Sequence, residues 1–304
     1  MATLLDFRRR IRSVKNTQQI TRAMKFVAAA RLRRAQEAAL AARPYAAELA
    51  RVLRSTMARI ESPQHPLLAV RPENNILAII LTGERGLAGA FNSNVLRKAH
   101  EFFRGHQGKK ITTIPVGKKG RDSLRRAGFT FAAEYVNVLA RVDFKTAREI
   151  ANLVAELYTK EEIDSVYIIF SEFKSVMVPT LAVEKLLPVE AIREDQDENA
   201  AENAPENIGR KKEKSNETPI DYIYEQPEEQ ILARLLPRYI ETQILRAMLE
   251  SSAAEHAARM TAMEAATNNA NDVIEALTLH MNKVRQAAIT KEIIEIVSGA
   301  SYGA

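Results

Sequence analysis

The sequence predicts an α/β fold in which the amino- and carboxy-terminal helices pair as a long antiparallel coiled coil, with an α/β domain inserted between them. Three observations support this prediction. Residues 1–43 and 238–298 contain neither glycine nor proline. Apolar residues in both stretches recur at alternating steps of three and four, and between them the pattern changes to short apolar runs typical of buried strands. As continuous helices the two stretches would be roughly 60 and 90 Å long, at about 1.5 Å per residue.

The recurring residues define two stripes, which we call the N-terminal and C-terminal seams. The N-terminal seam comprises Leu4, Phe7, Ile11, Val14, Gln18, Thr21, Lys25, Ala28, Leu32, Ala35, Ala39, Ala42, Ala46, Leu49 and Leu53. The C-terminal seam comprises Met260, Met263, Thr267, Ala270, Ile274, Leu277, Met281, Val284 and Ala288. Their average spacing of about 3.5 residues is the coiled-coil period. Pro44 lies inside the first stripe, where a proline kinks or interrupts a helix.

Small alanines are frequent in the N-terminal seam and let two helix backbones approach closely, whereas a free-standing dimeric zipper favours bulkier residues. We therefore expect the two ends of one chain to wrap around each other. The alternative is two separate bundle helices, each packed against another part of the fold.

Between the helices, residues 76–81, 111–116 and 166–170 read as short buried strands. Helices are expected near 94–104, 118–126 and 145–158, so strands and helices alternate. This alternation is typical of a Rossmann-like α/β domain with a mainly parallel sheet, and residues 180–187 are expected to join a sheet edge.

The predicted domains are an N-terminal coiled-coil helix (1–60), an α/β domain (74–190), a disordered loop insertion (191–219) and a C-terminal coiled-coil helix (228–300). Residues 193–219 are mostly acidic at first and mostly basic afterwards, without an apolar face to bury. We expect them to form a solvated surface loop.

Composition excludes several classes of site. The chain has no cysteine, which excludes disulfides, thiol nucleophiles and cysteine-ligated zinc. Its five histidines lack metal-ligand spacing, so we expect no metal site. The longest purely apolar run, 76–81, is too short to cross a bilayer, and the first residues lack the apolar region of a secretory signal.

The loops of the α/β domain carry no catalytic motif. The glycines in 83–89 do not have the G-x-G-x-x-G spacing of a dinucleotide site, and neither a P-loop nor a G-x-S-x-G elbow occurs. We therefore expect no catalytic residue and no cofactor, although an α/β enzyme with coiled-coil arms remains an alternative. Residues 86–94 could hold an anion at a helix N-terminus, but close backbone packing is the favoured explanation of these glycines.

Positive charge is concentrated at the amino terminus. Residues 1–34 contain eight arginines and two lysines against a single acid, Asp6, a net charge of +9. This charge predicts an acidic partner. Nucleic acid is one candidate, yet the only aromatic residue before position 26 is Phe7, which lies on the seam and is unavailable for stacking on bases. A merely solvated basic face is the other alternative.

Four blocks carry a resemblance to a known family. Residues 10–25 read RIRSVKNTQQITRAMK, 85–94 read RGLAGAFNSN, 259–270 read RMTAMEAATNNA and 289–301 read ITKEIIEIVSGAS. Together they resemble the gamma subunit of rotary (F-type) ATP synthases, and the resemblance spans nearly the whole chain. Two departures are Glu84, where the family usually has Asp, and the length of the 193–219 loop.

The resemblance implies a central rotor shaft without catalysis of its own. In the family, the coiled coil penetrates a head of alternating alpha and beta subunits, and the α/β domain forms the foot on a membrane ring of proteolipid subunits. Rotation of the ring and shaft, driven by ion flow, biases each catalytic beta site in turn. The implied partners are the alpha, beta and epsilon subunits and the proteolipid ring, with no nucleic acid. The implied location is peripheral, on the cytoplasmic side of the cell inner membrane.

The resemblance also implies two sets of contact residues. The residues expected to meet the catch loops of the beta subunits are Met24, Lys25, Arg285, Gln286, Thr290 and Glu292. Those expected to face the ring at the foot are Tyr222, Tyr224 and Glu225. Lys25 also lies on the N-terminal seam, so either the helix pairing ends before it or its stem snorkels outward.

Overall fold

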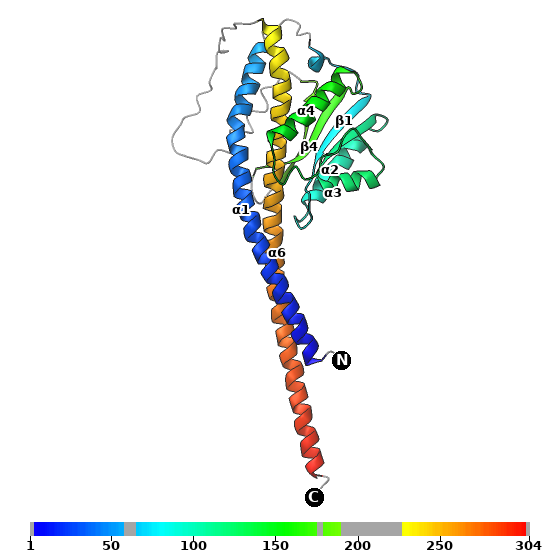
Figure 1. Ribbon diagram of the computed structural model, residues 1–304. Coiled ribbons are helices and arrows are strands. Elements are labelled where there is room, and N and C mark those ends of the chain that lie inside the picture. Colours follow the sequence, from blue (N-terminus) through cyan, green and yellow to red (C-terminus); the bar gives the residue numbers. More distant parts are fainter. Residues whose placement is uncertain (1–2, 58–64, 175–178, 190–226, 302–304) are drawn as a thin grey trace, which may run out of the picture. The chain divides into compact units, whose positions relative to one another are not determined.

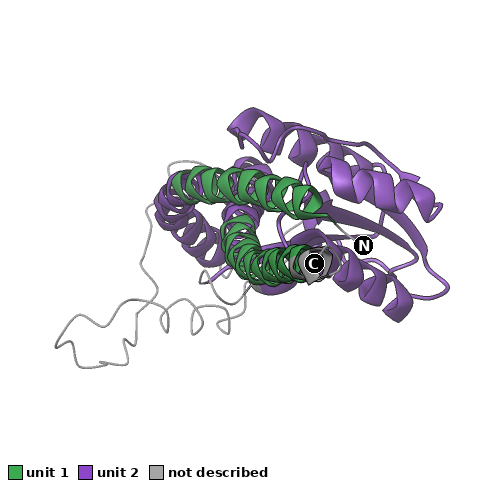
Figure 2. Cartoon of the chain, turned by 90° about the horizontal axis from the view of Figure 1, so that it is seen from below, with its two compact units in different colours: residues 1–30, 259–304 green, residues 31–258 purple. Residues whose placement is uncertain are grey.

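The computed structural model describes residues 3–57, 65–174, 179–189 and 227–301. The chain divides into two compact units, coloured separately in Figure 2. Residues 1–30 and 259–304 form the first, which we call the coiled-coil unit, and residues 31–258 form the second, the sheet unit. The long helices α1 (Leu4–Met57) and α6 (Glu228–Ser301) contribute to both units.

In the coiled-coil unit, α1 and α6 pair in antiparallel orientation (Figure 1). Phe7 contacts His280, with ring centroids 5.0 Å apart, and further along α1 the hydroxyl of Thr21 lies 2.8 Å from that of Thr267. Moving forward along α1 therefore means moving backward along α6. Every described residue of the two seams within this unit is buried or half-buried, and this pattern confirms the predicted coiled coil.

Proline does not interrupt either long helix. Pro44 lies inside α1 and Pro237 inside α6, and both helices continue on each side. Pro44 is exposed, whereas the seam residues Ala39, Ala46 and Leu49 around it are buried. The packing of this buried face holds the helix together across the proline, so the interruption considered for Pro44 does not occur.

The sheet unit contains a five-stranded sheet in the order β3-β2-β1-β4-β5. Strands β1 to β4 pair in parallel, and β5 pairs antiparallel with β4 at one edge, as expected for residues 180–187. The strands are β1 (Asn75–Leu81), β2 (Lys110–Val116), β3 (Thr130–Phe131), β4 (Ser165–Phe173) and β5 (Pro179–Leu187). Strand β3 and the short 3-10 helix η1 (Pro66–Leu68) were not among the elements predicted from the sequence.

Helices cover both faces of the sheet (Figure 1). Helices α2 (Phe91–Gly105) and α3 (Lys118–Arg126) bury Val95, Ala99, Phe103 and Leu124 against one face. Helix α4 (Phe144–Thr159) packs on the other, together with the parts of α1 and α6 that belong to this unit. The Asp143 side chain accepts a hydrogen bond from the Thr146 backbone at 2.8 Å and caps α4. The result is a three-layer α/β domain.

The predicted loop 191–219 lies entirely outside the described residues, as part of the range 190–226. The limits proposed for the four domains remain predictions.

Candidate functional site

Lys25 belongs to the seam and also reaches out of it. Its ammonium lies 2.5 Å from Glu264 Oε1 on α6, and its side chain is 32% exposed. The aliphatic stem follows the seam while the charged end meets a partner at its edge, so the snorkelling alternative is the one observed. Met24, next to it, is half-buried. These two predicted contact residues thus lie together on the paired part of α1.

Two more polar pairs precede Lys25 along α1. Gln18 Nε2 donates a hydrogen bond to Asn271 Oδ1, and the hydroxyls of Thr21 and Thr267 are 2.8 Å apart. We call the three pairs, Gln18–Asn271, Thr21–Thr267 and Lys25–Glu264, the polar block. A hollow of about 360 Å³ lies beside them, lined in part by Arg22 and Phe26.

Sequence reasoning did not identify Asn271 and Glu264 as partners. Each follows a seam residue, Ala270 and Met263 respectively. The sequence did contain an indication of polar pairing between the helices, because residues 18, 21 and 25 are polar and occupy successive seam positions.

The predicted contact residues on α6 lie near its carboxy-terminal end. Arg285, Gln286, Thr290 and Glu292 are all exposed, and the Thr290 hydroxyl donates to the Gln286 carbonyl at 2.9 Å. Since Phe7 meets His280 and α1 begins at Leu4, the antiparallel register carries Thr290 and Glu292 past the first turn of α1. These side chains are therefore available to a partner outside the pair of helices.

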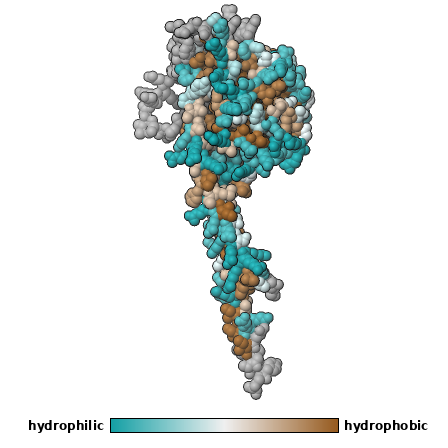
Figure 3. All heavy atoms as spheres, viewed as in Figure 1, coloured by the Kyte–Doolittle hydropathy of each residue, from teal (hydrophilic) through white to brown (hydrophobic). Residues whose placement is uncertain are grey.

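Apolar side chains are also exposed on this part of α6 (Figure 3). Ile289, Ile293, Ile294 and Ile296 are 49–71% exposed. Isoleucines gathered at one helix end, without a covering helix among the described residues, indicate a surface that another chain covers.

The first four arginines of α1 point to solvent. Arg8, Arg9, Arg10 and Arg12 are exposed, and none forms a salt bridge with a described residue. Arg9 and Arg10 contribute to lowering the pKa of Asp6, which is lowered chiefly by its hydrogen bonds with Thr3. The positive charge of this segment therefore remains available for an acidic partner.

The predicted ring-facing residues Tyr222, Tyr224 and Glu225 lie outside the described residues. Their assignment remains a prediction.

The carboxyl ends of parallel strands are where open α/β sheets usually bind ligands. Here the chain's own groups fill this edge. The Gly83 amide donates to Asn92 Oδ1 at 2.7 Å, the Gly120 amide donates to the Thr82 hydroxyl at 2.8 Å, and the Lys118 amide donates to Glu84 Oε2 at 3.0 Å. These three amides are thus already engaged.

Glycines at this edge allow close packing. A Cβ on Gly117, whose φ is +104°, would lie 1.9 Å from the Thr82 carbonyl oxygen, and a Cβ on Gly83 would lie 2.8 Å from Glu255 Oε1. Close packing therefore accounts for Gly83, where the neighbouring atoms belong to the side chains of Glu255 and Asn92. It is wrong for Gly86, where an added Cβ would meet no atom within 4 Å.

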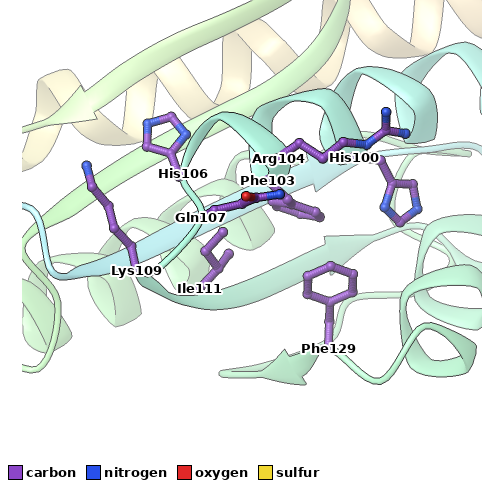
Figure 4. Close-up of a pocket in the computed structure, with 9 residues that line it drawn as sticks. His100, Phe103, Arg104, His106, Gln107, Lys109, Ile111 and Phe129 are labelled. Carbon is purple, nitrogen blue, oxygen red and sulfur yellow. The ribbon is translucent and has the colours of Figure 1, made fainter.

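A hollow of about 420 Å³ opens at the other end of the parallel strands, near the start of β2 (Figure 4). Its walls include Phe103, Phe129, His100, Arg104 and Lys109. The Lys109 ammonium is already bound to Glu73 Oε2 at 3.0 Å. The hollow lies at the carboxy end of α2 and the start of β2, away from the edge where α/β enzymes bind substrates, and so gives the enzyme alternative no support.

The described residues contain neither a metal-binding cluster nor a membrane-spanning helix. No group of three or more His, Cys, Asp or Glu side chains among them is placed to hold a metal ion. No helix in this part of the chain has the length and apolarity needed to cross a membrane.

Comparison with known proteins gives matches along almost the whole chain. A family model described as ATP synthase matches residues 3–301. The chain is 47% identical to the ATP synthase gamma chain of Solibacter usitatus and 46% identical to that of Pelotomaculum thermopropionicum, each over 99% of both sequences.

Solved structures with a similar fold include two from mitochondrial ATP synthases. One is a chain of the Euglena gracilis rotor in rotational state 1, with a TM-score of 0.61, 20% identity and coverage of 94% of this chain and 98% of that one. The other is a chain of the Tetrahymena thermophila central stalk and c-ring, with a TM-score of 0.57, 25% identity and coverage of 81% and 99%.

Proposed function

This chain belongs to the ATP synthase gamma-chain family, and from that membership we propose that it is the central rotor shaft that couples ion-driven rotation of a membrane ring to conformational cycling of the catalytic beta subunits. It is a non-catalytic subunit of the complex. The proposal rests chiefly on the 47% identity to a gamma chain over 99% of both sequences. It also rests on the antiparallel coiled coil that the two ends of the chain form.

The shaft acts through contacts that differ from one beta subunit to the next. A two-helix rod is not threefold symmetric, so at any moment it presents a different face to each of three beta subunits. A catalytic site changes its state only to the extent that the shaft binds its states with different free energies. Each turn therefore shifts every site through the same sequence of states.

The beta contacts fall in two places on the coiled-coil unit. Met24 and Lys25 contact a catch loop from α1, and Arg285, Gln286, Thr290 and Glu292 contact the catch loops from α6. Exposure of the four α6 residues supports this assignment, as does the 32% exposure of Lys25. Arg285 offers charge-assisted hydrogen bonds, which are the stronger kind.

The remaining partners are the alpha subunits of the head, an epsilon subunit docked on the α/β domain, and the proteolipid ring, which Tyr222, Tyr224 and Glu225 face. The protein is peripheral, on the cytoplasmic side of the cell inner membrane. Supporting this arrangement, chains of similar fold occur in structures described as a rotor and as a central stalk with a c-ring.

An affinity pull-down of the tagged full chain from native membranes tests the function. We expect alpha, beta and epsilon subunits and the proteolipid to be recovered together, and reconstitution with alpha and beta subunits to give multi-site ATP turnover. Recovery of the chain without alpha and beta subunits would contradict the proposal. Binding to DNA with an affinity that collapses in modest salt would instead favour the nucleic-acid alternative.

A further inference from the structure

We propose that the polar block fixes the register of α1 against α6, so that neither helix slides along the other by a heptad. The block contains Gln18–Asn271, Thr21–Thr267 and Lys25–Glu264, all within the coiled-coil unit.

The three pairs follow one another along one heptad of each helix. From Gln18 to Lys25 on α1 is seven residues, and from Asn271 back to Glu264 on α6 is also seven. The central pair is also bonded within each helix. The Thr21 hydroxyl is 3.0 Å from the Gln18 carbonyl, and the Thr267 hydroxyl is 2.7 Å from the Met263 carbonyl. One hydroxyl can therefore donate to its own helix while it accepts from the other hydroxyl.

The apolar part of the seams cannot set the register by itself. Continued at the same pitch, the observed pairing brings Ile11 level with Leu277 and Val14 level with Ile274. A slide of one heptad still places apolar residues opposite apolar residues over most of the seam. Such side chains discriminate weakly between neighbouring registers.

The polar block discriminates strongly. After a slide of one heptad in one direction, Thr21 becomes level with Ile274 instead of Thr267, and Gln18 becomes level with Thr278 instead of Asn271. After a slide in the other direction, Thr21 becomes level with Met260 and Gln18 with Glu264. In both cases the hydrogen bond between the hydroxyls of Thr21 and Thr267 is lost, because each threonine then faces an apolar side chain of the other helix. The loss of a hydrogen bond at a buried position disfavours the shifted registers.

This role differs from simple stabilisation. Polar residues at seam positions specify register at a cost in stability, because apolar side chains there would pack better. Replacing the block by apolar residues is therefore expected to preserve or raise stability while it removes the uniqueness of the pairing.

A fixed register would also keep the beta contacts of the two helices in place relative to one another. This consequence rests on the proposed function. A slide of one heptad shifts the helices by about 10 Å along their axis, at about 1.5 Å per residue. Such a shift would displace Arg285 and Gln286 relative to Met24 along the axis of the coiled coil. The separation between the two groups of beta contacts would then change.

The test measures the register directly, in the full chain. The absence of native cysteine allows spin labels at Ala23→Cys and Ala276→Cys, two exposed positions about 15 Å apart along the axis in the observed register. The test variant combines Gln18→Leu, Asn271→Leu, Thr21→Val and Thr267→Val. The matched control carries Thr17→Val, Gln19→Leu and Asn269→Leu, which change the same residue types at exposed positions.

We expect one distance population in the unchanged chain and in the control. In the test variant we expect a second population, displaced by about 10 Å along the axis, and a melting temperature no lower than that of the control. A single unchanged population in the test variant would overturn the proposal, as would a lower melting temperature, because the pairs would then only stabilise. A failure to recover alpha and beta subunits in the pull-down leaves the distance result unchanged, so the two proposals fail separately.

Discussion

The ammonium of Lys25 on α1 lies 2.5 Å from Oε1 of Glu264 on α6, at one end of the polar block. The two side chains are 32% and 49% exposed, so this ion pair lies at the rim of the helix interface and remains in contact with solvent. It therefore orients the two helices without the desolvation cost of a buried ion pair.

The energy of this pair should be small. A double-mutant cycle with Lys25→Met and Glu264→Gln should give a coupling free energy of about 0.2–1 kcal/mol, as is usual for exposed pairs. The coupling should weaken as salt is added, because exposed charges are screened. Urea unfolding of the four chains at low and high salt measures it, and a coupling above about 2 kcal/mol would contradict this description.

Ala28 should tolerate no charge. It is 1% exposed on the N-terminal seam, whereas Ala30 on the same helix is exposed. Ala28→Glu should lower the free energy of unfolding by more than about 2 kcal/mol, because it places an unpaired charge between the helices. Ala30→Glu is the matched control and should change it by less than about 0.5 kcal/mol. Equal effects in urea unfolding would count against the seam.

Arg285 and Gln286 should matter for turnover and not for folding. Both are exposed, so Arg285→Ala combined with Gln286→Ala should leave helix content and melting temperature unchanged. Multi-site ATP turnover of the reconstituted complex should fall by about tenfold, since hydrogen bonds to charged groups contribute about 1.5–3 kcal/mol. Lys283→Ala, at another exposed position of α6, is the control. Unchanged assembly, turnover and coupling in the double variant would contradict the assignment of Arg285 and Gln286 as contacts of the beta catch loops.

Glu73 should make stability depend on acid pH. Burial by itself would raise the pKa of its carboxyl, but hydrogen bonds from Lys109, Lys185 and Tyr167 outweigh burial and lower the pKa from 4.5 to about 2. Because the folded-state pKa is lowered, this contribution to stability is present above pH about 4.5 and is lost as the pH falls through about 2.

Glu73→Gln should therefore destabilise the chain at neutral pH, and its stability should approach that of the unchanged chain near pH 2. Thermal unfolding between pH 2 and 7 measures the difference. Glu162→Gln, at an exposed position of the same unit, is the control. A difference that does not depend on pH would contradict the linkage.

Glu250 should have the opposite pH dependence. The residue is 3% exposed on α6, its Oε2 has no hydrogen-bond partner among the described residues, and burial raises the pKa of its carboxyl. The neutral form is favoured in the folded state, so stability is lost as the pH rises through the folded-state pKa. Glu250→Gln should raise the melting temperature at alkaline pH, and Glu275→Gln, exposed on the same helix, should not. No gain at alkaline pH would contradict this expectation.

Local patterns were sufficient to predict most of the secondary structure. The apolar run at 76–81 became β1, and the helix expected at 118–126 coincides with α3. Strand β3 contains only two residues, Thr130 and Phe131, and so is too short to show an alternating pattern in the sequence. The order of the strands in the sheet was also not predicted, since no local pattern records which strand lies beside which.

The candidate site was predicted unevenly. Lys25 was identified as a contact residue, but its partner Glu264 was not, because Glu264 lies just off the C-terminal seam and resembles any solvated helix residue in the sequence. Likewise, the glycines at 83–89 excluded common ligand motifs, yet only the structure showed that Asn92, Thr82 and Glu84 accept hydrogen bonds from three amides at this edge.

The sequence by itself determined that both chain ends are long helices with apolar seams, because a helical period is a local property that a few turns of chain reveal. Only the tertiary structure decided the register of those seams, the outward path of the Lys25 side chain and the continuity of α1 through Pro44. Lys25 and Glu264 are 239 residues apart in the chain. Contacts over such distances form when the whole chain satisfies its buried groups together, so no local period can specify them.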